Sequence, residues 1–418
     1  MREYDIVVLG ATGYTGKLAA EHICTHLPTD LQWAIAGRSE QKLAAVIDEL
    51  KKVNPNRSAP KIEIANLSPD DLASLAKKTK VLINTVGPYH LYSTPVVEAC
   101  AENGTHYLDV TGEAPWTLQM IRKYHSTAQA NNAIMIPQIG IESAPSDLIT
   151  YALAAHIRQK YQTGVGDVVG TTHVLSASPS GGTLATVLSI ADFYSKAELA
   201  EANRGNWIFS PVPHPKPTAT TTSSSLSFFK KIARSLFGVR TVPELGTLTS
   251  SIAGSTNRAI VQRTWGLLDE GRYYGPNFTY QEYTTVRNRF VGVAVHFALI
   301  LGVMTLAIPP FKWILKKLVT SPGQGQSRDV TRKDVFDFRA VATADRAGEP
   351  KKAVGRVSHV GGAYYMTGIF LAEAAMVLVK DEKLVEKLRG GFMTPAMLGQ
   401  HYIDRLGQAG VDINVDTR

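Results

Sequence analysis

Cysteine is scarce in this chain, where only Cys24 and Cys100 occur among 418 residues. Both fall in segments predicted to be helical, and no group of Cys and His residues has the spacing of a metal site. The composition therefore excludes a disulfide framework, predicts no bound metal and favours a reducing, intracellular compartment. A secretory signal is not expected either, because the first predicted strand begins at residue 4.

Acidic residues are too few in the middle of the chain to balance the basic ones. Between residues 228 and 352 there are 19 Lys or Arg and 9 Asp or Glu, a net charge of +10, whereas the whole chain carries +8 and the remainder therefore −2. Because no nucleic-acid-binding module accompanies this region, we expect no nucleic-acid partner. An anionic membrane surface, or a substrate on a phosphorylated carrier, fits the charge better.

Three glycines spaced three residues apart follow the first apolar segment. The β-branched run at residues 4–9 leads into Gly10-Ala11-Thr12-Gly13-Tyr14-Thr15-Gly16, and an amphipathic segment comes next. This order of strand, glycine turn and helix is typical of a dinucleotide-binding loop. Gly10 permits the tight turn, Gly13 lets the backbone approach a pyrophosphate, and Gly16 lets the helix pack on the strand. The alternative is a tight turn that binds nothing.

The end of the second predicted strand indicates which dinucleotide would bind. Enzymes that use NAD usually carry an acidic residue there for the ribose 2′-hydroxyl, but here the strand at 31–36 is followed by Gly37, Arg38 and Ser39. A guanidinium and a hydroxyl suit a phosphate, so the sequence favours NADP(H). The alternative is that Arg38 stacks on the adenine or lies in solvent.

Strands and helices alternate through the first third of the chain. Further strands are predicted at 61–65, 80–85, 106–109 and 133–136, with helices at 40–52, 95–103 and 115–131 between them. This alternation predicts an α/β fold with a doubly wound parallel sheet, whose ligands lie at the carboxyl ends of the strands. Val86-Gly87-Pro88-Tyr89 and Thr111-Gly112-Glu113 both follow strands at that edge.

Several motifs taken together resemble those of the saccharopine dehydrogenase-like oxidoreductases, a family that includes trans-acting enoyl reductases. The motifs are the glycine loop and residues 36–39, 86–89, 107–113, 140–147, 180–183 and 394–399. The resemblance weakens between about residues 205 and 335. It implies a cofactor site formed by Gly10, Thr12, Gly13, Tyr14, Thr15, Gly16, Arg38, Ser39, Val86, Gly87 and Pro88.

The resemblance also implies the domain organisation. An NADP-binding Rossmann domain is expected at residues 1–140 and a second α/β (α+β) domain at 141–385. The C-terminal segment, 386–418, is expected to carry a helix that returns to pack on the first domain. Within the second domain, alternation at 335–344 and 351–360 around a turn predicts a hairpin, and residues 364–380 form a strongly apolar helix.

Candidate catalytic groups follow the predicted strand ends. Tyr89 offers a hydroxyl and Glu113 a carboxylate beside the expected nicotinamide, and His90 adjoins Tyr89. Each has a simpler interpretation: Tyr89 packs on the cofactor, Glu113 is a helix N-terminal charge, and His90 is exposed. Ser180 and Thr183 flank Gly181-Gly182, a turn whose N–H groups could bind a substrate oxyanion.

A long uncharged segment lies in the basic region. Residues 290–311 contain no Asp, Glu, Lys or Arg, and cations flank both ends. A true membrane crossing would separate the two ends of a chain that should meet in one domain, so we expect residues 290–317 to lie in one leaflet or at the surface of a membrane or lipid droplet, on the cytosolic face. The alternative is a fully buried helix of the second domain.

Three functions remain open from the sequence. The first is an NADPH-dependent reductase, of the enoyl type, that acts on a hydrophobic acyl, polyketide or lipid-like chain, free or carrier-bound. The second is a non-catalytic, nucleotide-sensing protein at a membrane. The third is a soluble amino-acid dehydrogenase of the saccharopine type, which the sequence favours least because no cluster of cations for a dicarboxylate follows the strand ends. A homodimer is compatible with each.

Overall fold

The computed structural model describes residues 2–176, 181–203, 207–214, 236–306, 308, 310–311 and 325–418, with the backbone alone for 181–184 and 306. Three predicted features fall wholly or mainly outside these residues. The first is Ser180 of the predicted substrate turn. The second is residues 216–227, whose many Thr and Ser residues predict a surface loop, with most of the basic and apolar segment 228–237 that follows. The third is residues 312–317, the cationic end of the segment predicted to associate with a membrane.

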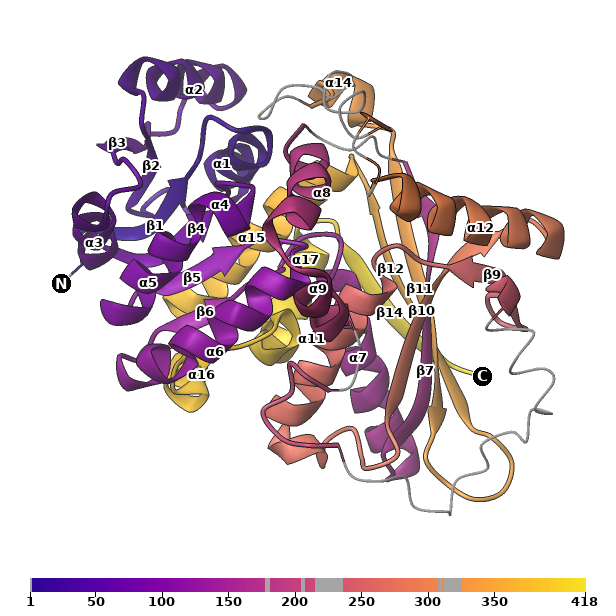
Figure 1. Ribbon diagram of the computed structural model, residues 1–418. Helices are drawn as coiled ribbons and strands as arrows, with labels where there is room; N and C mark the ends of the chain where they lie inside the picture. Colours follow the sequence, from indigo (N-terminus) through magenta and orange to yellow (C-terminus); the bar gives the residue numbers. More distant parts are fainter. Residues whose placement is uncertain are drawn as a thin grey trace.

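The first domain contains a parallel sheet with strand order β13-β6-β5-β4-β1-β2-β3 (Figure 1). The strands are β1 (Tyr4–Leu9), β2 (Trp33–Gly37), β3 (Lys61–Ile64), β4 (Thr79–Asn84), β5 (His106–Asp109), β6 (Ile134–Ile136) and β13 (Gly391–Phe392). Central strands such as β1 are apolar on both faces, because helices cover both sides of the sheet. The predicted doubly wound α/β fold is confirmed.

Helices from both ends of the chain cover this sheet. They are α1 (Tyr14–His26), α2 (Glu40–Val53), α3 (Pro69–Lys78), α4 (Tyr89–Tyr92), α5 (Thr94–Glu102), α6 (Ala114–Ala130) and α15 (Ala363–Lys380). α15 comes from the distant C-terminal part and packs along α1. A Cβ at Gly368 would lie 2.9 Å from the backbone of Leu18 and Ala19, so glycine is what permits this close approach.

The second domain is a mixed sheet with strand order β14-β12-β11-β7-β10-β9-β8. Its strands are β7 (Val165–Leu175), β8 (Arg240–Val242), β9 (Gly246–Ser250), β10 (Thr279–Val286), β11 (Val335–Ala344), β12 (Lys352–Val360) and β14 (Asp412–Thr417). β7 and β10 run parallel, and the other neighbours are antiparallel. The predicted hairpin is confirmed as β11 and β12. α7 (Ala144–Tyr161) and α11 (Gly254–Leu267) pack against this sheet.

The remaining helices connect or border the two sheets. They are α8 (Gly181–Phe193), α9 (Lys196–Asn203), α12 (Arg289–Leu306), α14 (Arg328–Thr331), α16 (Glu382–Leu388) and α17 (Gly399–Gln408), with short 3-10 turns at Asp269–Gly271 and Pro395–Leu398. In Figure 1, α8 and α9 lie between the two sheets. The four-residue helix α4 contacts α8, so a segment that follows the first domain reaches the carboxyl edge of the first sheet.

The C-terminal segment is shared between the domains. β13 extends the first sheet beside β6, and α17 packs on α15, which itself covers α1. The chain then ends as β14, an edge strand of the second sheet. Besides the helix expected to return to the first domain, the segment thus supplies a strand to the second sheet, because the alternation of Ile413 and Val415 with polar residues lets the last strand pair with β12.

The two apolar helices of the second half have opposite surroundings. Among the helices of the described residues, α15 alone is long and apolar enough to span a membrane, and 83% of its 18-residue window is buried within the protein. α12 ends at Leu306, earlier than predicted, ahead of the Pro309-Pro310 pair that cannot continue a helix. Most of its described side chains are exposed, so the alternative of a fully buried helix is wrong for this segment.

Candidate functional site

The glycine loop joins β1 to α1 with the geometry of a phosphate-binding turn. Gly10 has a φ of +84°, which an L side chain rarely adopts, and its carbonyl accepts a hydrogen bond of 2.9 Å from the N–H of Gly13. Gly16 lies against this turn, because a Cβ there would be 2.7 Å from Thr85 Oγ1 and 2.9 Å from the Cα of Ala11. The roles predicted for Gly10 and Gly16 therefore match their surroundings.

Gly13 leaves the space that a pyrophosphate needs. A Cβ at this position would meet one described atom within 4 Å, the carbonyl oxygen of Gly10 at 3.3 Å. Gly13 is also the N-cap of α1, and no side chain caps this end of the helix. The first N–H groups of α1, on Tyr14, Thr15 and Gly16, are thus free to bind an anion at the positive end of the helix dipole.

Arg38 and Ser39 follow β2, next to the glycine loop in the sheet. Arg38 is exposed and makes no hydrogen bond or ion pair with the described residues, so its guanidinium is available for a 2′-phosphate. The Ser39 hydroxyl has a structural role as well, because its Oγ accepts a hydrogen bond of 3.4 Å from the N–H of Lys42 and so caps α2. These residues fit NADP, whose nicotinamide supplies hydride chemistry when it is bound.

The loop after β4 carries Val86, Gly87 and Pro88 into α4. The N–H of Val86 donates to Asn84 Oδ1 at 3.1 Å, and its carbonyl accepts from Ser93 Oγ at 2.7 Å. Both bonds fold the loop back over the end of the strand. This places the predicted cofactor-binding residues of the loop at the same sheet edge as the glycine loop, because β4 and β1 are parallel neighbours.

Tyr89 is buried beneath this loop. Its hydroxyl donates to the carbonyl of Asn84 at 3.2 Å and accepts from the N–H of Val110 at 3.4 Å. Burial, reinforced by the nearby carboxyl of Asp109, raises the pKa of Tyr89 well above its ordinary value. A hydroxyl engaged with the backbone on both sides is suited to holding the loops after β4 and β5 together.

Glu113 is buried, and its carboxylate faces α4. Its two oxygens accept the N–H groups of Tyr89 and His90, each at 2.8 Å, and Oε2 also lies 2.7 Å from His90 Nδ1. Thr186 of α8 reaches Oε1 at 3.4 Å. The simpler interpretation that His90 is exposed is wrong: His90 is buried beside Phe193 and Tyr194, and Glu113 holds its ring. Glu113 thus caps the start of α4.

A buried carboxyl organises the edge of the sheet. Asp109, at the end of β5, accepts the N–H groups of Thr111 and Gln138 at 2.9 Å and the hydroxyl of Tyr107 at 2.8 Å. Burial raises its pKa to about 7. Asp109 therefore joins the loop after β5 to the loop after β6, and it fixes how Gly112 and residues 140–143 lie relative to each other.

Sequence reasoning missed Glu142, which stands in this second loop. Its side chain is exposed, and a Cβ on Gly112 would lie only 2.7 Å from Glu142 Oε2. Burial of the surrounding region, together with the charge of Glu282, raises the pKa of Glu142. The signal for it in the sequence is its place in the 140–147 motif, which follows the predicted strand at 133–136.

Glu282 of β10 is the second carboxyl of this region. It is buried and accepts hydrogen bonds from Ser146 Oγ at 2.7 Å, Tyr280 Oη at 2.7 Å and Asn257 Nδ2 at 2.9 Å. Asn257 also donates to the carbonyl of Glu142 at 2.7 Å. The second domain therefore contacts the loop after β6 directly, through α11 and β10.

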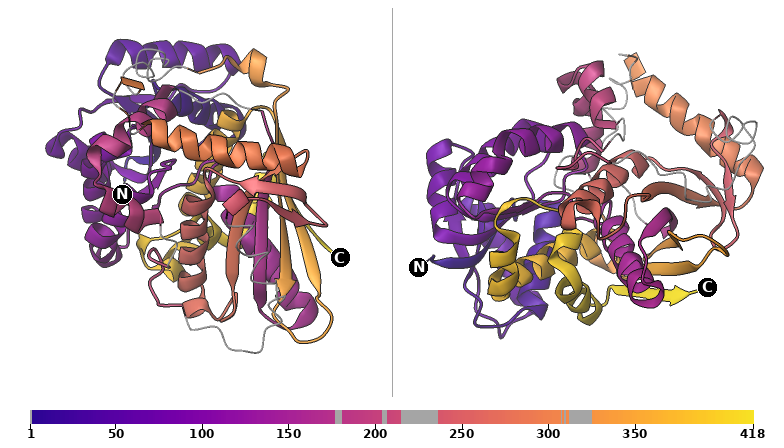
Figure 2. Two further views of the ribbon diagram at one scale, coloured as in Figure 1. Left: turned by 45° about the vertical axis from the view of Figure 1, so that its right-hand side comes forward. Right: turned by 90° about the horizontal axis from the view of Figure 1, so that it is seen from below.

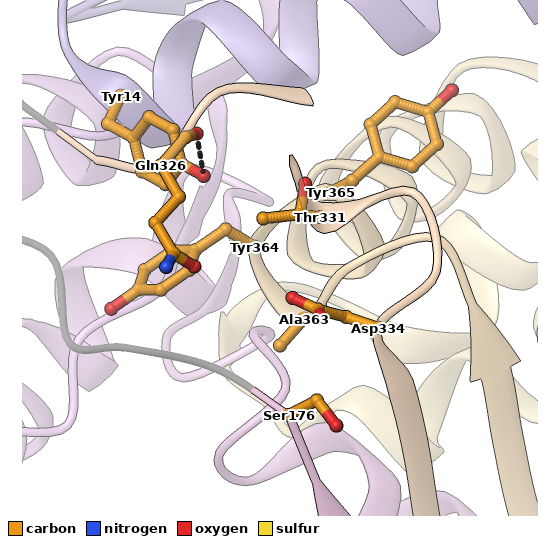
Figure 3. Close-up of a pocket in the computed structure, with 8 residues that line it drawn as sticks. All are labelled: Tyr14, Ser176, Gln326, Thr331, Asp334, Ala363, Tyr364 and Tyr365. Carbon is orange, nitrogen blue, oxygen red and sulfur yellow. Dashed lines mark hydrogen bonds between the residues drawn. The ribbon is translucent and has the colours of Figure 1, made fainter. Parts of the chain in front are cut away.

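A small pocket lies beside the glycine loop. Figure 3 shows it between the start of α1 and the beginning of α15, with the hydroxyl of Tyr14 donating to the carbonyl of Gln326 at 2.8 Å. The ring of Tyr14 also packs edge-on against Tyr364, 5.1 Å between centroids. The lining residues are Tyr14, Ser176, Gln326, Thr331, Asp334, Ala363, Tyr364 and Tyr365. The predicted cofactor loop is thus in contact with the second domain.

The predicted substrate turn falls at the start of α8. Gly181, Gly182 and Thr183 form the first turn of this helix, whereas Ser180 lies outside the described residues. The role of these four residues stays a prediction. Further along α8, Thr186 contacts Glu113. The helix therefore borders the region that the loops after β4, β5 and β6 surround.

Comparison with known proteins agrees with this site. The family model of the saccharopine dehydrogenase NADP binding domain matches residues 6–136. The trans-acting enoyl reductase of Mycobacterium ulcerans is 30% identical over 428 residues, covering 99% of this chain and 98% of the relative. The protein of the same name from Mycobacterium tuberculosis (strain H37Rv) is 30% identical over 429 residues, with 98% and 97% covered.

A solved structure supports the fold. Apo saccharopine dehydrogenase (L-Glu forming) from Saccharomyces cerevisiae superposes over 99% of both chains with a TM-score of 0.58 at 10% identity. The matched domain binds NADP, and the relatives extend over the full length. The chain is therefore an NADP-dependent oxidoreductase and belongs to the saccharopine dehydrogenase-like family that includes the trans-acting enoyl reductases.

Proposed function

We propose that this protein reduces the carbon–carbon double bond of an α,β-unsaturated acyl thioester with NADPH. The observation that carries the proposal is the full-length relationship to proteins named trans-acting enoyl reductase, combined with a dinucleotide loop whose geometry is intact. A relationship that spans both domains includes the substrate half of the enzyme as well as the cofactor half.

The chemistry fits the arrangement of the residues. Reduction of an activated double bond needs a hydride at one carbon and a proton at the next, and NADPH supplies the hydride. Arg38 and the glycine loop would hold the dinucleotide, and the loops after β4, β5 and β6 would surround the reacting end. The catalytic roles of Tyr89 and Glu113 stay predictions; both side chains form hydrogen bonds with the backbone after β4 and so help to position that loop.

The test follows oxidation of NADPH by its absorbance while the purified protein is incubated with enoyl thioesters of short and long acyl chain. We expect turnover with the long chain, dependence on NADPH over NADH, and loss of turnover in Gly13→Val. Turnover with a 2-oxo acid and an amino acid, and none with any enoyl thioester, would contradict the proposal and favour an amino-acid dehydrogenase.

We further propose that the enzyme meets its hydrophobic substrate at an anionic lipid surface through α12. In the right-hand view of Figure 2 this helix runs along the outer edge of the molecule. Beyond Arg289, its first residue, its exposed side chains are apolar, with Phe290 89%, Leu301 63% and Met304 62% exposed, and Arg287 precedes it. An apolar helix with cations at its ends suits insertion into the headgroup region of anionic lipids.

One side of α12 is anchored to the second sheet. The carbonyl of Gly292 accepts a hydrogen bond of 2.7 Å from Thr249 Oγ1, and His296 Nδ1 lies 2.8 Å from Ser250 Oγ. Insertion would therefore hold the domain at the surface. Flotation with phosphatidylserine-containing vesicles tests this, with Leu301→Glu/Met304→Glu expected to abolish flotation and Val53→Glu/Ile64→Glu, equally charged and exposed on the first domain, expected to retain it. Equal flotation of the two variants would refute the proposed surface.

A further inference from the structure

We propose that Glu142 is the acid that delivers the proton to the substrate carbon, an inference that rests on the double-bond reduction proposed above. Glu142 is exposed and stands in the loop after β6, at the carboxyl edge of the cofactor-binding sheet. Its carboxylate accepts no hydrogen bond from the residues that the structure describes, so it is free to meet a ligand.

The position of Glu142 depends on a glycine in the neighbouring loop. Any side chain at Gly112 would approach Glu142 Oε2 to 2.7 Å and Oε1 and Cδ to 3.2 Å. Gly112 follows β5 by three residues, where ligands of doubly wound sheets bind. Asp109 fixes this loop and the one after β6 through the N–H groups of Thr111 and Gln138. The carboxylate is thus held over the reacting edge of the sheet.

The second domain contributes Glu282, the carboxyl that interacts with Glu142. Burial raises the pKa of Glu282, and the hydrogen bonds that it receives from Ser146, Tyr280 and Asn257 partly offset that rise. Glu142 has no such donors among the described residues, and both burial of the region and the charge of Glu282 raise its pKa. Glu282 is the titratable group that faces Glu142. Of these two carboxyls, Glu142 is the exposed one, so it is the one that can pass a proton to a ligand.

The other carboxyls and hydroxyls of this edge are already engaged. The Tyr89 hydroxyl donates one hydrogen bond to the backbone and accepts one from it. Glu113 accepts hydrogen bonds from the first N–H groups of α4 and contacts the ring of His90. Asp109 is fully buried and accepts three hydrogen bonds. Glu142 is the exposed carboxylate beside them, and exposure is what contact with a substrate requires.

Hydride addition at the β-carbon leaves the electron pair of the double bond in an enolate, and NADPH becomes NADP⁺. The O–H bond of Glu142 then breaks, its electron pair stays on the carboxylate, and the enolate pair forms the new C–H bond at the α-carbon. Water returns a proton to Glu142 before the next turnover.

The experiment separates proton transfer from hydride transfer. A saturated acyl thioester deuterated at the α-carbon is incubated with the full-length protein and NADPH, a combination in which no redox reaction can occur, and loss of deuterium is followed by NMR. We expect Glu142→Gln to lower the exchange rate by roughly 10²- to 10⁴-fold, the usual contribution of a general acid–base group. Glu142→Asp should retain part of the exchange, and Glu386→Gln on exposed α16 should exchange like the wild type.

Two further measurements test whether Glu142→Gln slows the exchange only by disturbing the structure. NADPH affinity, measured by fluorescence titration, should be unchanged in Glu142→Gln. Titration of the Glu142 carboxyl by ¹³C NMR without cofactor should show a raised pKa that falls in Glu282→Gln, because a negative neighbour has been removed. Wild-type exchange in Glu142→Gln, or an ordinary pKa for Glu142, would overturn the inference. A wild-type protein that catalyses exchange yet reduces no enoyl thioester would instead refute only the proposed function.

Discussion

Replacement of Gly13 by valine tests the cofactor site most directly. Gly13 has φ −81° and ψ 165°, an extended conformation that valine adopts without strain. The new Cβ would meet only the Gly10 carbonyl, at 3.3 Å, among the described atoms. The fold should therefore accept the side chain, which would instead fill the space in front of the first N–H groups of α1.

The expected loss follows from those N–H groups. A pyrophosphate pushed away from two of them loses two charge-assisted hydrogen bonds, each worth about 1.5–3 kcal/mol. The sum of about 3–6 kcal/mol corresponds to roughly 150- to 25,000-fold weaker binding. Both NADPH and NADH should suffer equally, because the pyrophosphate is common to the two cofactors.

Titration calorimetry with each cofactor measures the effect, and thermal unfolding checks the fold. Gly407→Val on α17 is a matched control, since a Cβ there has no described atom within 4 Å and the helix takes no part in the site. We expect wild-type binding from this control. Binding by Gly13→Val within a few-fold of the wild type would show that the loop is a structural turn, and so refute the argument.

Three further predictions follow from the same geometry. Arg38→Ala should weaken NADPH by roughly 10- to 150-fold and leave NADH nearly unchanged, a loss of about 1.5–3 kcal/mol that titration calorimetry would detect; equal losses for both cofactors would contradict the 2′-phosphate role. Gly16→Ala should lower the free energy of unfolding by about 1–3 kcal/mol in denaturant titrations, because its Cβ would overlap Thr85 and Ala11, whereas an unchanged midpoint would contradict this contact. Burial lowers the pKa of His106 from 6.5 to about 4, so the folded state binds fewer protons than the unfolded chain between these values and stability should fall as the pH drops from about 6.5 to about 4. The loss should be at most about 3 kcal/mol, and His106→Gln should flatten that part of the stability–pH curve.

The fold of the first domain was predictable because its signals are local. Buried strands such as residues 4–9, the glycine spacing, and the serine caps of α2 and α3 each determine structure within a few residues. β13 was not predictable, since it contributes only Gly391 and Phe392 to the sheet and pairs with a strand more than 250 residues earlier in the chain. β14 was missed for the same reason: its partner, β12, is distant in sequence.

The candidate site was predictable in its cofactor half and not in its catalytic half. Glycines and Arg38 act through backbone geometry and charge, which the sequence displays. The roles of Glu113 and Glu142 depend on which groups their carboxylates meet, and those partners come from other elements: Tyr89 and His90 for Glu113, and Gly112 and Glu282 for Glu142. Position after a strand end indicates Glu113, which is buried, and gives no reason to prefer Glu142, which is exposed.

The two halves of the site depend on both domains being present. The first domain offers the glycine loop and Arg38, yet the loop that bears Glu142 is bound by Asn257 of α11 and influenced by Glu282 of β10. Ser143 Oγ also donates to Asn257 Oδ1 at 2.8 Å, immediately before α7 begins. Residues 1–140 alone contain neither Glu142 nor Asn257 and Glu282, nor the α15 that covers α1. Dinucleotide recognition is therefore local to the first domain, whereas proton delivery requires the second domain to hold the acid over the cofactor-binding edge.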